Sequence, residues 1–373
     1  MKFIKTLGVL LLVTFLFSCS KDGVLEMEAE NITIPDFKVI GEDVENIYQY
    51  SYKGSLSQGT QINLTQSLGL SPAYLTLRQV SEVLSFYSFS SGNFSVVQHN
   101  VITEQSNAYP DFYSISDERS IIWGTNSEDL LFLGYFSPIG SDNFGLRTID
   151  PETGNSTDIS IAINVDKVYD PLYYQQRLIL SYRGVDDNFH VTIFNTETRS
   201  IIQTFDFNSD IPNILIDELG NLGIISGKAN NSFAYQVYDI ESLILINEVN
   251  FNLNKYLNPG PLKGAIYENT LYYSNSYAQP SIVPFGPAYF DFVLDKNIII
   301  DMISIVRQVE EETQFSIDLT AMQYIASDEV FVMGYGNIDN ANMITGGILI
   351  IAKDGTLLER IEVPFAPTYF IKP

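Results

Sequence analysis

Residues 191–207 read VTIFNTETRSIIQTFDF, and this stretch decides the fold because it is one copy of a repeated hairpin. A run of β-branched and aromatic residues begins at Val191, gives way to a polar turn, and is followed by a second alternating run that ends at Phe207. Such runs favour extended structure, and a short polar turn between two of them predicts an antiparallel hairpin.

The same hairpin recurs along the chain. Further copies span residues 146–161, 235–251, 290–306 and 347–363, with a fainter copy at 84–101. The six turns lie near residues 91, 152, 197, 241, 296 and 354, about 53 residues apart on average. Two of the turns, DPETG at 150–154 and KDG at 353–355, combine residues that preset or tolerate turn dihedral angles.

Two more strands precede most hairpins. A strand followed by a loop rich in Gly, Asp and Asn occupies residues 130–145, 177–190, 221–234 and 329–347. Further upstream, a short innermost strand led by proline is expected at residues 110–113, 171–174 and 212–215. Four antiparallel strands in a repeat of this length are typical of a β-propeller blade. A pair of β-sandwiches is the competing architecture, but it leaves the repeat unexplained.

The sequence favours six blades. Residues 74–78 lie close before the first hairpin, so we expect them to form a second strand and the first unit to lack its innermost strand. Residues 366–371 supply that strand, and strands from both termini close the ring. Residues 37–66 then form an extra hairpin; if they build their own blade, the count is seven. Residues 307–324 are the best helix candidate, but Glu310, Glu311 and Glu312 favour a solvated loop.

The N-terminus carries a targeting signal. Two lysines precede an apolar run at residues 7–17, which is too short to span a bilayer, and the run ends at Cys19, the single cysteine of the chain. We therefore expect a signal peptide at 1–18, an acidic tether at 19–36 and one propeller domain at 37–373. The mature chain can form no internal disulfide.

Residues 16–19 (LFSC) resemble a bacterial lipobox, which implies lipid attachment at Cys19 and a membrane as partner. Together with the repeat, the chain resembles the outer-membrane lipoproteins with propeller bodies that are common in Bacteroidota. This resemblance concerns architecture alone. It implies an outer-membrane location, and we favour the cell surface over the periplasmic face.

The formal net charge of −25 repels nucleic acid and anionic lipid headgroups. No nucleic-acid partner is therefore expected. With 45% hydrophobic residues and 17% charged residues the chain has the composition of a folded protein.

Asp and Asn residues in the strand-connecting loops are the main candidate ligand-binding groups. They are Asp142, Asn143, Asp186, Asp187, Asn188, Asp339 and Asn340, with Asn230 and Asn231 in an equivalent loop. Equivalent loops lie on one face of a propeller, where their oxygen atoms can bind Ca²⁺ or sugar hydroxyls. The alternative is that these residues form turns, which Asp and Asn do by default. No resident cofactor or metal is expected beyond this Ca²⁺ alternative.

Aromatic residues around Pro280, Pro284 and Pro287 form a second candidate set, of which Tyr277 and Tyr289 are the binding candidates. The alternative is that they fill the wedge between blades. His99 and His190 occupy equivalent strands of different units, so a joint metal site is not expected.

No catalytic residues are assigned from the sequence, because no motif for nucleophilic or phosphate chemistry is found. The leading hypothesis is a non-catalytic binding or scaffold lipoprotein of the cell envelope that binds a protein partner or a glycan. The alternatives are a carbohydrate-active enzyme using carboxylates, and a nutrient-capture protein of a TonB-dependent uptake system.

Overall fold

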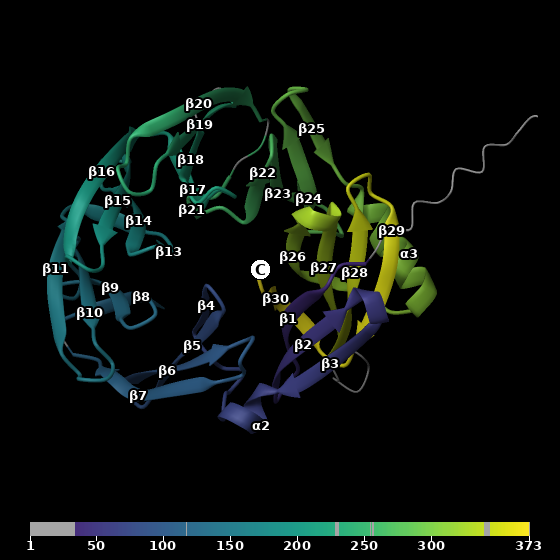
Figure 1. Cartoon of the computed structure of the whole chain (residues 1–373), viewed down its shortest axis with the longest axis horizontal. Helices are drawn as coiled ribbons and strands as arrows, with labels where there is room; N and C mark the ends of the chain where they lie inside the picture. Colours follow the sequence, from purple (N-terminus) through teal and green to yellow (C-terminus); the bar gives the residue numbers. More distant parts are fainter. Residues whose placement is uncertain are drawn as a thin grey trace, which may run out of the picture. The chain divides into compact units, whose positions relative to one another are not determined.

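The computed structural model describes residues 34–116, 118–227, 231–253, 255, 257–338 and 344–372. The predicted signal peptide, Cys19 and the tether up to residue 33 lie outside the described residues. From Pro35 onward the chain is one compact unit. Its described strands form seven sheets arranged around a central opening, as a β-propeller (Figure 1).

Blades 1 to 3 each have four strands, named from the centre of the ring outward. Blade 1 contains β30 (Ala366–Phe370), β1 (Phe37–Glu42), β2 (Ile47–Lys53) and β3 (Gln58–Asn63). Blade 2 contains β4 (Thr76–Val80), β5 (Val83–Ser90), β6 (Asn93–Asn100) and β7 (Ser106–Ser114). Blade 3 contains β8 (Ser120–Asn126), β9 (Leu131–Phe136), β10 (Phe144–Ile149) and β11 (Ser156–Ala162).

Blades 4 and 5 each carry one additional short strand. Blade 4 contains β12 (Val165–Val168) and β13 (Leu172–Tyr174), both paired with β14 (Arg177–Gly184), then β15 (Phe189–Asn195) and β16 (Ser200–Asn208). Blade 5 contains β21 (Gly260–Pro261), β17 (Ile211–Ile216), β18 (Leu222–Gly227), β19 (Ser232–Tyr238) and β20 (Leu245–Asn252).

Blades 6 and 7 complete the ring. Blade 6 contains β22 (Gly264–Tyr267), β23 (Thr270–Ser276), β24 (Phe285–Asp291) and β25 (Lys296–Ile299). Blade 7 contains β26 (Asp318–Ile325), β27 (Val330–Ile338), β28 (Ile344–Ala352) and β29 (Leu357–Val363). The helical segments among the described residues are η2 (Gly54–Leu56), α2 (Leu64–Leu68), α3 (Met302–Thr313) and η3 (Ala326–Asp328). No helix in the described part of the chain is long and apolar enough to cross a bilayer.

The up-and-down order of strands gives the ring two distinct faces. We call upper the face that carries the loops between the second and third strands of each blade and the connections to the next blade. The lower face carries the loops between the first and second strands and between the third and fourth strands.

The preference for six blades is wrong, and the alternative of seven is confirmed. Residues 37–63 form three strands, and β30 pairs with β1 to complete their blade. Residues 74–78 do not form a second strand, because β4 is the innermost strand of blade 2. Its distance to the hairpin is short because only Ser81 and Glu82 separate β4 from β5. Closure by strands from both termini is confirmed, but the expected blade is wrong: residues 366–370 complete blade 1 and not the unit that contains the 84–101 hairpin.

The prediction that proline-led segments form the innermost strands is correct in two of three cases. Residues 172–174 and 211–216 lie in β13 and β17 on the inner side of their blades. Pro110 instead lies in β7, the outermost strand of blade 2, and β8 is the innermost strand of blade 3. An edge strand tolerates a proline because the missing N–H costs no hydrogen bond there.

The loop expected at residues 307–324 is wrong. A helix spans Met302–Thr313, and its buried residues Met302, Ile305, Val306 and Val309 follow the 3, 4 spacing of one helix face. The Asp301 side chain accepts a hydrogen bond from the Ser304 amide at 3.2 Å and caps the helix. The apolar face of this helix begins at Met302, before the segment considered in the sequence analysis, and the acidic residues 310–312 occupy only the last turn of the helix.

The core lies between blades, because alternate residues of each strand face opposite neighbours. In β14, Leu178 and Leu180 pack with blade 3, whereas Ile179 packs with blade 5. Close packing requires glycine at some positions: a Cβ atom at Gly134 would lie 2.4 Å from the Trp123 ring.

The C-terminal strand is held by three blades. The Thr320 hydroxyl of blade 7 donates to the Pro367 carbonyl. The Ile371 amide donates to the Lys38 carbonyl of blade 1 at 3.0 Å. In blade 2, the Gln79 side chain accepts from the Lys372 amide at 2.9 Å.

Candidate functional site

The upper face brings two of the predicted Asp/Asn loops next to each other. Residues 142–143 join β9 to β10 in blade 3, and residues 186–188 join β14 to β15 in blade 4. The Val165 amide donates to the Asp142 carbonyl, and the Val185 amide donates to the Asn164 carbonyl, both at 2.9 Å. The connection between blades 3 and 4 therefore contacts both loops.

The polar groups of these loops take part in local turns. Asp186 accepts hydrogen bonds from the Asn188 backbone amide at 3.2 Å and from the Asn188 side-chain amide at 2.7 Å. These bonds hold the pKa of Asp186 below its usual value. Asp187 has a φ of +63° and lies 3.4 Å from Arg183. The turn interpretation explains this geometry; binding of Ca²⁺ or sugar by these loops remains a prediction.

Other predicted residues lie outside the described part of the chain. Asp339 and Asn340 belong to the segment 339–343, and Asn230 belongs to 228–230. Cys19 also lies outside it. These predictions stay untested.

Tyr277 and Tyr289 lie toward opposite ends of blade 6 and do not form one site. The Tyr277 hydroxyl, on the upper-face loop, donates to the Ile300 carbonyl at 2.6 Å, and burial raises the pKa of Tyr277. Tyr289 lies beside Lys353 of a lower-face turn, whose Nζ is 5.4 Å from the ring centre. Both tyrosines pack against the apolar cluster between blades 6 and 7, as the wedge-filling alternative predicts.

Each histidine has its own protein partners. His99 is buried, and its two ring nitrogens lie 2.9 Å from the Ser106 hydroxyl and 3.0 Å from the Gln49 side-chain oxygen. His190 lies 2.7 Å from Asp206. Among the described residues, no group of three or more His, Cys, Asp or Glu side chains is arranged to hold a metal ion.

A cavity of about 290 Å³ lies on the upper face between blades 2 and 3. Its apolar lining comes from Phe94, Ile115, Ile121 and Ile139, and Arg119 supplies a charged wall. Ile115 and Ile139 are both more than half exposed. The cavity therefore combines apolar walls with one guanidinium group, an arrangement suited to an amphipathic group of a ligand or partner.

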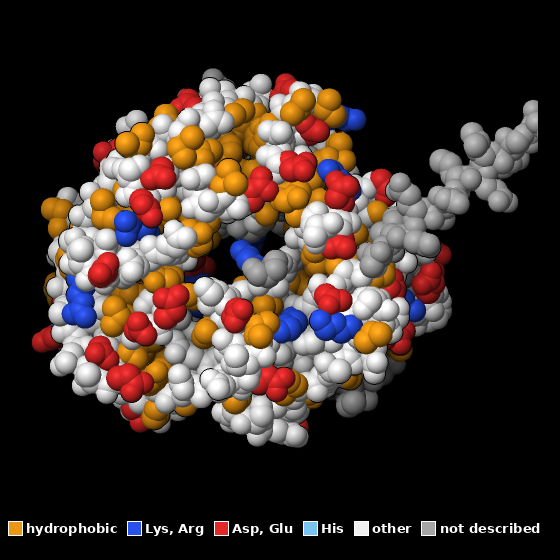
Figure 2. All heavy atoms as spheres, in the orientation of Figure 1, with side chains coloured by type: hydrophobic (Ala, Val, Ile, Leu, Met, Phe, Trp, Pro, Cys, Tyr) orange, Lys and Arg blue, Asp and Glu red, His pale blue; other side chains and the backbone are white. Residues whose placement is uncertain are grey.

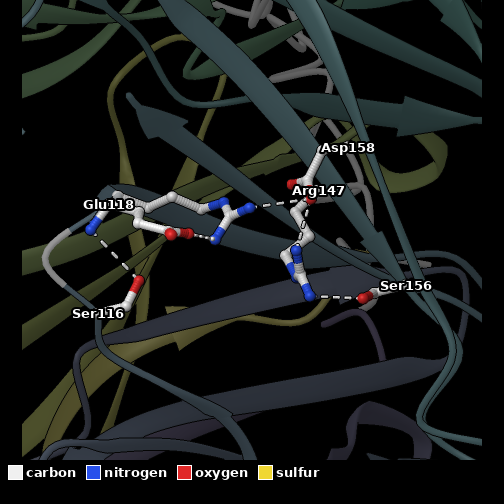
Figure 3. Close-up of polar contacts among 6 residues, drawn as sticks. Ser116, Glu118, Arg147, Ser156 and Asp158 are labelled. Carbon is white, nitrogen blue, oxygen red and sulfur yellow. Dashed lines mark hydrogen bonds and ion pairs between the residues drawn. The ribbon is translucent and has the colours of Figure 1, made fainter. Parts of the chain in front are cut away.

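Two arginines beside this cavity share one carboxylate. Asp158 lies 3.1 Å from Arg119 and 2.6 Å from Arg147 (Figure 3). The Arg147 guanidinium also donates a hydrogen bond to the Ser156 hydroxyl (Figure 3). In the segment that precedes Arg119, the Ser116 hydroxyl accepts a hydrogen bond from the Glu118 backbone amide at 3.4 Å (Figure 3).

Aromatic rings complete this ionic cluster. The Arg119 guanidinium lies 5.4 Å from the centre of the Tyr135 ring, and that of Arg147 lies 5.7 Å from the centre of the Tyr113 ring. Burial is the largest single influence on the pKa of Arg119 and lowers it, but the Asp158 carboxylate and the hydroxyl groups of Tyr135 and Tyr113 together outweigh burial and raise this pKa. Arg119 therefore stays charged, and the cluster joins β7 of blade 2 to blade 3 and fixes one wall of the cavity.

The apolar surface continues along the upper face from the cavity to blade 4. We call the upper row the four exposed aliphatic residues Ile115, Ile139, Ile163 and Val185, which are 54–67% exposed. Ile115 and Ile139 line the same cavity, and the 142–165 and 164–185 hydrogen bonds connect the remaining loops. The row thus runs over three neighbouring blades.

The sequence analysis did not identify the upper row or the ionic cluster. Arg147 and Asp158 are directly opposite in the β10–β11 hairpin, so aligning the predicted hairpin at 146–161 could have found this pair. The upper row gives a weaker signal: single aliphatic residues inside otherwise polar loops.

The central opening is lined by the innermost strands, and Figure 2 shows a Lys or Arg side chain within it. Arg78 of β4 donates to the Gly124 carbonyl at 3.3 Å and contacts Asp170 of blade 4 at 2.7 Å. Arg78 thereby joins three blades. Lys372 follows β30, and burial lowers its pKa.

Comparison with known proteins supplies no family. No family model and no curated sequence matches the chain. Solved structures that resemble it include a Bacteroides fragilis protein named as a proposed 6-phosphogluconolactonase, with a TM-score of 0.49, 11% identity, and 91% of this chain and 99% of the other covered.

Two further similar structures are TolB from Acinetobacter baumannii and a chain of the mitotic checkpoint complex. TolB has a TM-score of 0.41 and 10% identity, covering 89% of this chain and 80% of TolB. The checkpoint chain has a TM-score of 0.43 and 13% identity, covering 78% and 79%. At these identities the likeness concerns the fold alone.

Proposed function

We propose that this protein is a lipid-anchored binding protein of the cell envelope that holds a partner on the upper face of its propeller without turnover. The lipobox-like residues 16–19 support the anchor. The upper row supports the binding surface. A rigid ring that carries exposed loops is a common way to present a binding site.

The upper row is the observation that carries the proposal. Its four side chains stand on loops of three blades and share a surface with the 290 Å³ cavity. Contiguous exposed apolar residues on a folded protein mark contact sites, because their burial against a partner is favourable. The charged wall of Arg119 adds a polar group that can orient what enters the cavity.

Site-specific photo-crosslinking in the producing cells tests this surface. A photoreactive amino acid replaces Ile139 or Ile163 in the upper row, and Ile102 of a lower-face turn in the control. We expect one discrete adduct from both upper positions and none from Ile102. The same adducts from all three positions, or none from any, would contradict the proposed surface.

Cell fractionation tests the anchor separately. In the Cys19→Ala variant no lipid can be attached, so the protein should move from the membrane fraction to the soluble fraction and lose incorporation of labelled palmitate. Protease treatment of intact cells then distinguishes the two faces, since only a surface-exposed propeller is accessible. Labelled palmitate on the variant, or its absence from the wild-type protein, would contradict lipid attachment at Cys19.

A further inference from the structure

The lower face of blades 5 and 6 carries a second apolar surface. Four loop residues there are among the most exposed aliphatic side chains of the described chain: Leu219 at 82%, Ile244 at 68%, Val293 at 73% and Leu294 at 69%. They lie in three turns, β17–β18, β19–β20 and β24–β25. We call these four residues the lower patch.

The β22–β23 turn connects the β17–β18 turn to the β24–β25 turn, and the β19–β20 turn lies beside the β17–β18 turn. Glu218, next to Leu219, accepts a hydrogen bond from the Glu268 amide at 3.1 Å. The Phe292 amide donates to the Asn269 carbonyl at 2.9 Å, which brings the β24–β25 turn to the same place. Within blade 5, Leu222 pairs with Tyr238, so the turns preceding and following these residues are neighbours. The lower patch is therefore one surface.

Hydrogen bonds to aspartate side chains order the backbone of these turns. Asp217 accepts from the Leu219 amide at 2.9 Å, Asp239 from the Ser242 amide at 2.7 Å, and Asp291 from the Leu294 amide at 2.9 Å. A turn whose backbone is already ordered loses little backbone freedom on binding, which favours affinity.

Negative charge surrounds the lower patch. Residues 217–221, 239–244, 267–270 and 291–296 contain seven acidic residues and one basic residue, Lys296. Four of the acids, Glu218, Glu241, Glu268 and Asp295, are exposed. None of the seven takes part in an ion pair between described residues, since the pairs lie elsewhere in the ring.

We propose that the lower patch binds a basic amphipathic segment of a partner protein, in which Lys or Arg alternates with aliphatic residues. The aliphatic tips supply apolar area, and the surrounding carboxylates select positive charge and exclude negative charge. A second copy of this chain would bring the same acidic turns into contact, and an anionic membrane would be repelled. The lower patch is on the opposite face from the upper row, so the proposal does not depend on the proposed function.

Binding of two synthetic peptides to the purified propeller tests the proposal. One 12-residue peptide alternates Lys with Leu, and its counterpart carries Glu in place of Lys. We expect the basic peptide alone to bind in fluorescence anisotropy, with affinity falling as salt increases. The L219S/I244S/V293S/L294S variant should weaken binding by about tenfold or more, since loss of interface anchors typically costs above 1 kcal/mol.

A matched variant of the upper row, I115S/I139S/I163S/V185S, serves as the control and should bind the basic peptide as the wild type does. A separate variant, E218Q/E241Q/E268Q, leaves the apolar tips in place and should weaken binding and reduce its salt dependence. It keeps the test decisive if the serine variant folds poorly. Equal binding of both peptides, or unchanged binding by both lower-patch variants, would overturn the proposal.

Two alternative occupants give distinct results. Self-association in sedimentation, lost only in the lower-patch serine variant, would identify a second copy instead. Binding to phosphatidylethanolamine vesicles, lost only in that variant, would identify a membrane surface. Either result overturns the assignment to a basic protein segment.

Discussion

A Cβ atom at Gly346 would lie 2.2 Å from the Tyr335 carbonyl oxygen and 2.6 Å from that of Phe365. Both neighbours are backbone atoms, so neither can rotate away. We expect Gly346→Ala to lower the free energy of unfolding by about 1–3 kcal/mol, as overpacking of a close contact does. Urea unfolding measures the change.

Thr345→Ala is the control, because it alters the adjacent residue of the same strand without adding an atom near either carbonyl. Its effect should be smaller than that of Gly346→Ala. Equal unfolding midpoints for Gly346→Ala and the wild type would show that the strand has room to move at this position.

His99 links stability to pH. Burial lowers the pKa of His99 in the folded protein, whereas the unfolded chain binds this proton near pH 6.5. As pH falls below about 6.5, the unfolded state takes up a proton that the folded state refuses, so stability decreases by at most about 1.4 kcal/mol per pH unit. The decrease ends when pH reaches the lowered folded-state pKa.

We expect His99→Gln to reduce this decrease, since glutamine does not titrate. Urea unfolding of both proteins at pH 7.5, 6.5 and 5.5 measures it. Identical pH dependence in the two proteins would assign the acid sensitivity to other groups.

At the scale of the element, β30 closes the ring. Its pairing with β1, the buried Phe370 side chain and the bonds to Gln79 depend on residues that follow Phe365. Deletion of residues 366–373 should cost on the order of 5 kcal/mol, the scale of removing a large buried side chain together with its surroundings. Hydrogen exchange should then be fastest in β1, whose edge is left unpaired.

Thr368→Val provides a graded comparison, because it removes only the hydroxyl that donates to the Ile40 carbonyl and to Glu42. It should lower stability by about 1 kcal/mol. A truncated protein that unfolds at the wild-type urea concentration would show that β30 does not close the ring in solution.

The hairpins were predictable because their signal is local. Alternating residues on both sides of a turn, as at 191–207, set two strands without knowledge of the rest of the fold. The order of the strands within a blade, from the centre of the ring outward, was less predictable. Residues 74–78 were assigned from their distance to the hairpin, and residues 110–113 from the proline that leads them. The choice of innermost strand instead depends on pairing with distant strands, and Pro110 is tolerated because β7 is an edge.

At the scale of the whole molecule, negative charge opposes compaction. The formal net charge is −25, with 45 acidic and 20 basic residues, so added salt should screen the mutual repulsion of the carboxylates. Raising NaCl from 50 to 500 mM should increase the melting temperature by a few degrees, about the change that 1 kcal/mol gives a domain of this size. Surface ion pairs such as Lys53–Asp36 oppose this trend only weakly.

Calorimetry at both salt concentrations measures the effect, and sucrose at matched osmolality controls for general exclusion from the surface. A lower melting temperature at high salt would show that attractive pairs between blades, such as Arg78–Asp170, outweigh the repulsion.

The candidate surfaces could be predicted only in part. Equivalent loops of a repeat lie on the same face of the propeller, so the sequence could predict that residues 142–143 and 186–188 lie on one face of neighbouring blades. The upper row could not be predicted, because an isoleucine in a loop has no periodic signal and its exposure depends on how blades adjoin. The lower patch could not be predicted either, because it forms where turns of two blades lie side by side.

Strand β30, near residue 370, completes the blade that begins with β1. While the ribosome is still translating blades 2 to 7, β1 has an unpaired edge, and no partner exists for it until residues 366–370 emerge. Nascent propellers of this kind therefore present an aggregation-prone edge for nearly the whole of translation. For a chain that is exported, translocation in an unfolded state removes the problem, because both ends then reach the folding compartment before the ring has to close.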